Sequence, residues 1–168
     1  GPNLEAIEQI LAAASHVPEM DFVIIGSACR PFAGRSIPSN VKMLGQVEAE
    51  ARDSLLAVAD VALNPMLSGS GTNLKMLDYF AAGIPVISSQ FGARGLRIED
   101  GHHFILAANE LADTLRGFLS QDEEEVRAIV SNARLLVESH YSWQIIADNF
   151  AEALSHHGFE TGMKFATS

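Results

Sequence analysis

Apolar and polar residues follow two different periods along the chain. Near the N-terminus, apolar residues recur three or four positions apart, which is the spacing of one helix face: Leu4, Ile7, Ile10, Leu11 and Ala14. A continuous apolar run over residues 21–25 comes next, and Gly26 and Ser27 end it. The pattern predicts a helix and then a buried strand, with Gly26 and Ser27 at the carboxyl end of that strand.

The same alternation continues to about residue 155. Short apolar runs predict further strands at residues 41–44, 61–63, 86–88 and 104–106. Helices are predicted at about residues 48–59, 72–82, 109–119, 123–139 and 142–155. Strands that alternate with helices indicate consecutive βαβ units. We therefore expect an α/β fold with a Rossmann-like parallel sheet of about five strands, helices on both faces and ligands at the carboxyl edge.

Length and composition are typical of one globular domain. The chain has 168 residues, of which 48% are hydrophobic and 19% are charged. We expect a domain over residues 1–158, a tail over residues 159–168, and no transmembrane segment, because no apolar run reaches about 18 residues. Cys29 is the single cysteine. It leaves no internal disulfide, and together with the absence of an apolar leader it favours a cytoplasmic location.

The net charge limits the kinds of partner. It is −10, and the 11 Lys and Arg residues are scattered along the chain. Nucleic acid and anionic membranes need a clustered cationic face, so we expect neither as a partner. A phosphate group can still bind where backbone N–H groups converge on it.

The segment of residues 64–87 carries the most specific chemical signal. A strand ends there, a loop rich in Gly and Ser follows, and a helix is predicted to begin at Thr72. Ser70 and Thr72 offer hydroxyl groups, and Gly69 and Gly71 leave the backbone uncovered. Because the first N–H groups of a helix attract anions, this segment predicts a diphosphate site that needs no Walker lysine.

Two charged residues follow on the predicted helix. Lys75 and Asp78 lie three positions apart, so they share one helix face. One interpretation makes them a cation for phosphate and a carboxylate for ribose hydroxyls. The other makes them a surface ion pair worth a few tenths of a kcal/mol, and the spacing alone does not decide between the two.

Other kinds of site have weaker support. The glycine pattern of residues 69–74 lacks the third glycine of a dinucleotide fingerprint, which disfavours NAD. The adjacent pairs His102–His103 and His156–His157 point in different directions on any regular element, and no carboxylate completes a metal set with diagnostic spacing. We interpret these histidines as surface residues and expect neither a metal nor a cofactor.

Several ordered motifs together resemble one enzyme family. The stretches GSGTNLK at residues 69–75 and LDYFAAGIPVI at residues 77–87 are similar to the donor-site signature of the GT-B glycosyltransferases of family 4, the group 1 glycosyltransferases. Further similar motifs occupy residues 23–27, 41–47, 59–63 and 92–96. The resemblance covers about residues 3–155 and corresponds to the C-terminal domain of such enzymes.

The resemblance implies a donor-binding domain of a retaining glycosyltransferase. The full-length enzyme would transfer a sugar from a nucleotide diphosphate donor to an acceptor hydroxyl, without an obligatory metal. Acceptor recognition would belong to an N-terminal domain absent from this chain, so we expect donor binding without transfer. A nucleotide-sugar epimerase of the same architecture and a non-catalytic nucleotide-sugar-binding module are the alternatives.

The resemblance also assigns residues to parts of the donor. Two glutamates eight positions apart mark the family's donor site, and here Ser70 replaces the first, which contacts the sugar, and Asp78 replaces the second, which contacts the ribose. Lys75 is the matched cation for the diphosphate. The resemblance places a base pocket at Gln46 and Val47, and Gly26 and Ser27 at the neighbouring strand end are candidates for the same cleft. Arg94 of the next loop is either an added charge or a solvated arginine. The other candidates are the signature residues Gly69, Gly71, Thr72, Asn73 and Leu74.

Overall fold

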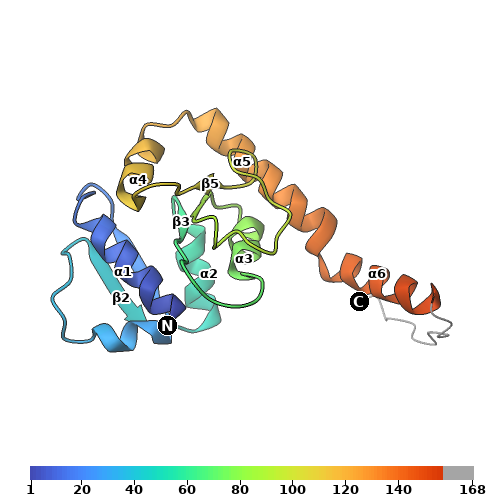
Figure 1. Ribbon diagram of the computed structural model, residues 1–168, viewed down its shortest axis with the longest axis horizontal. Helices are drawn as coiled ribbons and strands as arrows, with labels where there is room; N and C mark the ends of the chain where they lie inside the picture. Colours follow the sequence, from blue (N-terminus) through green and yellow to red (C-terminus); the bar gives the residue numbers. More distant parts are fainter. Residues whose placement is uncertain (157–168) are drawn as a thin grey trace.

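The computed structural model describes residues 1–156 of the chain (Figure 1). The tail predicted for residues 159–168 and the second histidine of the pair His156–His157 lie outside the described residues. The helices are α1 (Pro2–Ala14), α2 (Ala49–Ala57), α3 (Lys75–Ala81), α4 (Leu111–Leu119), α5 (Glu123–Leu136) and α6 (Trp143–His156). A 3-10 helix occupies Ser27–Phe32 and a π-helical turn occupies Val137–Tyr141, between α5 and α6.

The strands are parallel, as predicted, but they form two hydrogen-bonded groups. The strands are β1 (Phe22–Ile25), β2 (Val41–Gly45), β3 (Ala62–Asn64), β4 (Val86–Ser88) and β5 (Ile105–Leu106). β1 pairs with β2, and β3, β4 and β5 pair in that order. A single sheet was expected. Within the described residues β1 and β3 are not paired, so side-chain packing and not a backbone ladder joins the two groups.

Helices cover both faces of the sheet formed by β3, β4 and β5. Ile87 of β4 belongs to a buried cluster with α1 and α4, whereas its neighbour Val86 belongs to a second cluster with α3 and α5. Successive residues of a strand point to opposite faces, so the two clusters lie on opposite sides of β4. The first cluster also contains Phe22 and Ile24 of β1, which is how β1 and β2 attach to the rest of the molecule. The predicted α/β class is confirmed.

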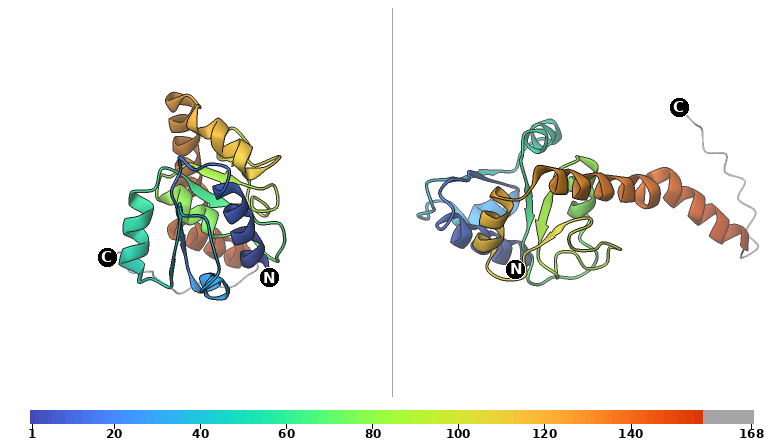
Figure 2. Two further views of the ribbon diagram at one scale, coloured as in Figure 1. Left: turned by 90° about the vertical axis from the view of Figure 1, so that its left-hand side faces the viewer. Right: turned by 90° about the horizontal axis from the view of Figure 1, so that it is seen from above.

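The C-terminal helices extend away from this body. α5 begins at Glu123, where the carboxylate of Asp122 accepts hydrogen bonds from two backbone N–H groups of the first turn. Figures 1 and 2 show α5 crossing the body and α6 projecting beyond it. A helix was predicted for residues 123–139. In the structure, α5 ends at Leu136 and the π-helical turn Val137–Tyr141 follows it directly. No helix among the described residues combines the length and the apolar character that a membrane span requires.

The helix after β3 begins later than predicted. It was expected from Thr72, but α3 starts at Lys75. Gly69 and Gly71 have φ angles of 128° and 75°, so the loop runs at least through Gly71. Residues 72–74 also stay outside the helix, and the N–H of Leu74 donates to the carbonyl of Thr72 at 3.1 Å. The predicted left-handed glycine after this helix is confirmed, because Gly83 has a φ of 73° and its N–H donates to the carbonyl of Phe80.

Candidate functional site

A cavity of about 280 Å³ lies where β3 and β4 end. Three segments form it: the first turn of α1, the loop from β3 to α3, and the loop that follows β4. Its lining residues are Pro2, Asn3, Met66, Gly69, Ser70, Gly71, Thr72, Asn73, Lys75 and Arg94. The structure thus brings the predicted loop residues together with Lys75 and with Arg94, which comes from a different loop.

Lys75 is the first residue of α3 and is partly buried. Its Nζ donates a hydrogen bond to Oδ1 of Asn3, 3.4 Å away, and burial lowers the pKa of its ammonium group. A cation at the start of a helix is disfavoured by the helix dipole. Within the part of the chain that the structure describes, the ion pairs do not include Lys75, so its charge has no carboxylate partner.

Arg94 brings a second cation to the cavity. Its Nη1 donates to the carbonyl of Phe91 at 3.1 Å, and its guanidinium carbon lies 3.7 Å from the centre of the Phe91 ring. Like Lys75, it takes part in none of the ion pairs among the described residues. The cavity therefore holds two cations without a carboxylate, in a chain whose net charge is −10.

Side chains add positive charge to what the sequence predicts for the start of the helix. The start of the helix was expected to present free N–H groups to a phosphate. In the structure, the N–H groups of Met76 and Leu77 donate to the carbonyls of Asn73 and Leu74 at 3.1 and 2.9 Å. These two donors of the short α3 are therefore used internally, and the side chains of Lys75 and Arg94 and nearby hydroxyls add to the attraction for an anion.

The hydroxyl-bearing residues lie on the open side of the cavity. Ser70 and Thr72 are both exposed and both belong to the lining. Ser68, just before them, donates to the carboxylate of Glu5 at 2.6 Å, which ties the loop to α1. Both hydroxyls are exposed, so they can donate hydrogen bonds to phosphate or sugar oxygens.

Two predicted residues of the same segment lie outside the lining. Leu74 is 64% exposed at the residue before α3. Asp78 is exposed on α3, and its charge adds to the effect of burial in raising the pKa of the Tyr79 hydroxyl. The structure therefore separates Asp78 from the cavity that contains Lys75.

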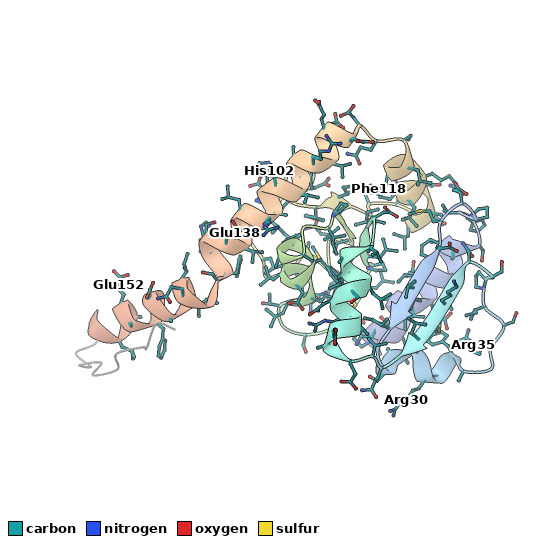
Figure 3. All side chains as sticks on the ribbon, turned by 180° about the vertical axis from the view of Figure 1, so that it is seen from behind. Arg30, Arg35, His102, Phe118, Glu138 and Glu152 are labelled. Atoms are coloured by element: carbon teal, nitrogen blue, oxygen red, sulfur yellow. The ribbon has the colours of Figure 1, made fainter. Side chains whose placement is uncertain are left out.

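The other predicted residues gather at the carboxyl ends of β1 and β2. Gly26 and Ser27 follow β1, and Gln46 and Val47 follow β2. Oε1 of Gln46 accepts a hydrogen bond from Nη2 of Arg30 at 3.1 Å, and Figure 3 shows Arg30 at this end of the molecule. These residues form a second region, which does not contribute to the lining of the cavity.

Sequence reasoning missed three lining residues. Pro2 and Asn3 belong to α1, far along the chain from the loop, and nothing in the local pattern points to them. Met66 is buried at the start of the loop, and its apolar side chain is of a type that is common in protein cores. Position in the fold, and not residue type, places these three at the cavity.

Comparisons with known proteins agree on one family. A model of the family Glycosyl transferases group 1 matches residues 3–122. A phosphatidyl-myo-inositol mannosyltransferase of Mycobacterium leprae is 28% identical over 112 residues, covering 64% of this chain and 29% of that protein. A GDP-mannose-dependent monoacylated alpha-(1-6)-phosphatidylinositol monomannoside mannosyltransferase of Corynebacterium glutamicum is 26% identical over 164 residues, covering 90% and 42%.

A solved structure has the same fold. The Anabaena protein Alr3699/HepE in complex with UDP-glucose superposes with a TM-score of 0.72 at 19% identity, covering 89% of this chain and 44% of that one. The chain therefore spans less than half the length of each of these three proteins.

Proposed function

Since the chain belongs to the group 1 glycosyl transferases, we propose that it is the donor-binding, C-terminal part of a retaining glycosyltransferase. The longer enzyme transfers a sugar from a nucleotide diphosphate sugar to an acceptor hydroxyl. In this proposal the cavity binds the diphosphate. An N-terminal domain binds the acceptor, so the chain by itself binds donor but does not complete the transfer.

One observation carries the proposal: Lys75 and Arg94 line the same cavity and neither has a carboxylate partner among the described residues. Partly buried cations without a counter-ion are costly in the free protein, and an anionic ligand relieves that cost. During transfer, negative charge develops on the leaving diphosphate. Two cations already in place stabilise that charge and so lower the barrier.

The other groups of the donor extend from the cavity. We propose that the sugar lies near Ser70, which is exposed at the mouth, and that Asp78 accepts hydrogen bonds from the ribose. Gln46 and Val47, with Gly26 and Ser27, are then candidates for the nucleobase. The names of the similar proteins suggest GDP-mannose and UDP-glucose as the first donors to test.

Thermal unfolding with a panel of UDP-, GDP-, ADP- and CDP-sugars tests the proposal. A ligand at 100 times its Kd adds about 2.7 kcal/mol to the free energy of unfolding, which is readily measured. We expect at least one nucleotide sugar to raise the Tm. Replacing Lys75 by Ala removes most of that rise, because the variant lacks one of the two charges that meet the diphosphate.

The matched control is Lys42→Ala, which removes an exposed lysine of β2. This variant is expected to respond to the ligand as the parent chain does. The proposal is wrong if no nucleotide sugar raises the Tm. The assignment of Lys75 is wrong if Lys75→Ala and Lys42→Ala respond alike.

A further inference from the structure

Two buried polar side chains lie directly behind the cavity, at the ends of β3 and β4. Asn64 is 1% exposed and Ser88 is 0% exposed. A buried polar side chain is costly unless hydrogen bonds satisfy it. Both side chains have such bonds, and their partners include the loops that form the cavity.

The amide of Asn64 contacts both loops at once. Its Oδ1 accepts a hydrogen bond from Nδ2 of Asn73 at 3.2 Å, and its Nδ2 donates to the carbonyl of Gly92 at 3.1 Å. Asn73 precedes Lys75 by two residues, and Gly92 precedes Arg94 by two residues. One side chain therefore joins the two segments that carry the cations of the cavity.

Two glycines of the loop after β4 are closely packed, Gly92 against the ends of β3 and β4 and Gly95 against the loop before α3. A methyl group on Gly92 would lie 2.5 Å from both the carbonyl oxygen of Asn64 and the Oγ of Ser88. A methyl group on Gly95 would lie 2.7 Å from Oγ1 of Thr72. Such distances are well inside van der Waals contact, so the loop after β4 rests directly on the loop before α3.

Ser89 adds a further bond between the loops. Its hydroxyl donates to the carbonyl of Met66 and accepts from the N–H of Gly92 at 2.9 Å. Ser88 contributes within the strands, since its Oγ lies 3.3 Å from Nδ2 of Asn64 and 3.1 Å from the Asn64 carbonyl oxygen. Asn64 thus belongs to a buried network, in which Ser88 and Ser89 also take part.

We propose that Asn64 is a positioning residue of the donor site. It touches no ligand, because it lies beneath the lining. By bonding to Asn73 and to Gly92, it holds Lys75 and Arg94 where both can meet one diphosphate. A site held in its binding geometry avoids the cost of ordering loops on binding. The ligand in this inference rests on the proposed function, whereas the coupling of the loops rests on the network alone.

A purely structural role for Asn64 makes a different prediction, and Asn40 provides the comparison. Asn40 is also an asparagine that holds backbone, since its Nδ2 contacts the carbonyls of Ala14, Val17 and Met20 at 3.1, 3.2 and 2.9 Å. It lies between α1 and β2, outside the cavity lining. Asn64→Ala and Asn40→Ala should both lower the Tm, but only the first should change ligand binding.

Hydrogen exchange and binding of inorganic pyrophosphate test the proposal on this chain. In the free protein, Asn64→Ala is expected to raise amide exchange in both residues 66–75 and residues 89–97. It should also weaken pyrophosphate binding about tenfold, which is about 1.4 kcal/mol. Asn40→Ala should raise exchange around residues 14–22 and leave the Kd within about twofold, the ordinary spread of an unrelated substitution.

Two further variants separate the two arms of the network, and Asn73→Ala, at a partly buried residue, remains informative if the variants of buried Asn64 do not fold. Asn64→Asp keeps an acceptor for Asn73 but cannot donate to the carbonyl of Gly92, so exchange should rise mainly in residues 89–97. Asn73→Ala should raise exchange mainly in residues 66–75. If neither variant raises exchange in its loop, Asn64 does not couple the loops and the proposal fails.

The pyrophosphate-binding measurements can also contradict the proposal. Equal pyrophosphate affinities of the Asn64 and Asn40 variants would overturn the positioning role even if the loops loosen. If the parent chain binds neither pyrophosphate nor any nucleotide sugar, the proposed function fails. In that case the exchange measurements still decide whether Asn64 holds the two loops together.

Discussion

The carboxyl ends of the two strand groups differ in how their polar residues are held. Beyond β3 and β4, buried Asn64 bonds to both loops that carry the two cations, and buried Ser88 bonds to Asn64. Beyond β1 and β2, the polar side chains of Ser27 and Gln46 are exposed, and Gln46 bonds to an exposed arginine. The polar side chains behind the first region are fixed by buried hydrogen bonds, whereas those of the second region are exposed.

In the proposed function, this difference suits the two ends of a nucleotide sugar. The diphosphate carries the charge that changes during transfer, so the groups that meet it must stand in place before the reaction. A nucleobase is neutral and flat, and backbone groups with adaptable side chains are enough to bind it. Three predictions test whether the two regions differ in this way.

The largest effect is expected from a methyl group added at the centre of the rigid region. In Gly92→Ala, the new Cβ would lie 2.5 Å from Asn64 and Ser88 atoms that are themselves buried. Overpacking of this kind costs about 3 kcal/mol, or roughly 6–12 °C in Tm for a chain of this size. Thermal unfolding measures it.

Gly45→Ala is the control from the second region. Gly45 ends β2 with a φ of 71° and has open space around it, so only the left-handed backbone strain of about 1 kcal/mol applies. Equal losses of Tm in the two variants would show that the region beyond β3 and β4 is no more tightly packed than the other.

An intermediate effect is expected from pH. Burial lowers the pKa of Lys75, so its ammonium group loses a proton at a lower pH than an exposed lysine does. The diphosphate of a nucleotide sugar binds the protonated form, and its affinity should fall as the pH rises from 7 toward 10. Without ligand the sign is opposite: the unfolded chain keeps that proton longer, so stability from this group rises with pH.

Calorimetric titration of the nucleotide sugar at several pH values tests this prediction. Lys75→Arg is the control, because a guanidinium keeps its charge throughout this range. Its binding should be nearly independent of pH. A parent profile as flat as that of Lys75→Arg would mean that Lys75 does not meet the diphosphate.

The smallest effects are expected from the neutral parts of the donor. Gln46→Ala and Asp78→Asn change exposed residues outside the cavity lining, so each should alter the free energy of unfolding by less than about 0.5 kcal/mol. Both should weaken a nucleotide sugar severalfold while leaving the affinity for inorganic pyrophosphate unchanged. An equal loss for both ligands would place these residues in the cation region instead.

Local sequence predicted most of the fold and part of the site. The strands at Phe22, Val41 and Val86 and the left-handed Gly83 were all predicted, because periodicity and turn chemistry depend on neighbouring residues. The start of α3 was wrong by three residues. The two glycines with positive φ explain why no helix begins before Thr72, but the local sequence does not show that residues 72–74 also stay in the loop.

The family signature likewise found the loop and Lys75 but not the support around them. The sequence left two interpretations of Arg94 open, a ligand-binding residue or a solvated arginine, because it does not show which loop the side chain faces. Asn64 was only the first residue of the segment 64–87, directly after the strand predicted over residues 61–63. Its burial and its bonds to Asn73 and Gly92 join residues 9 and 28 positions away along the chain, and no local pattern contains that information.

The sequence by itself determined the order of helices and strands, the glycine- and hydroxyl-rich loop, and a lysine at its end. Those properties depend on backbone preferences and side-chain spacing within a few residues. Only the tertiary structure decided that the strands form two groups, that Arg94 and the first turn of α1 join Lys75 around one cavity, and that Asn64 lies beneath it. These depend on which surfaces exclude water together, a property of packing between segments distant in the chain.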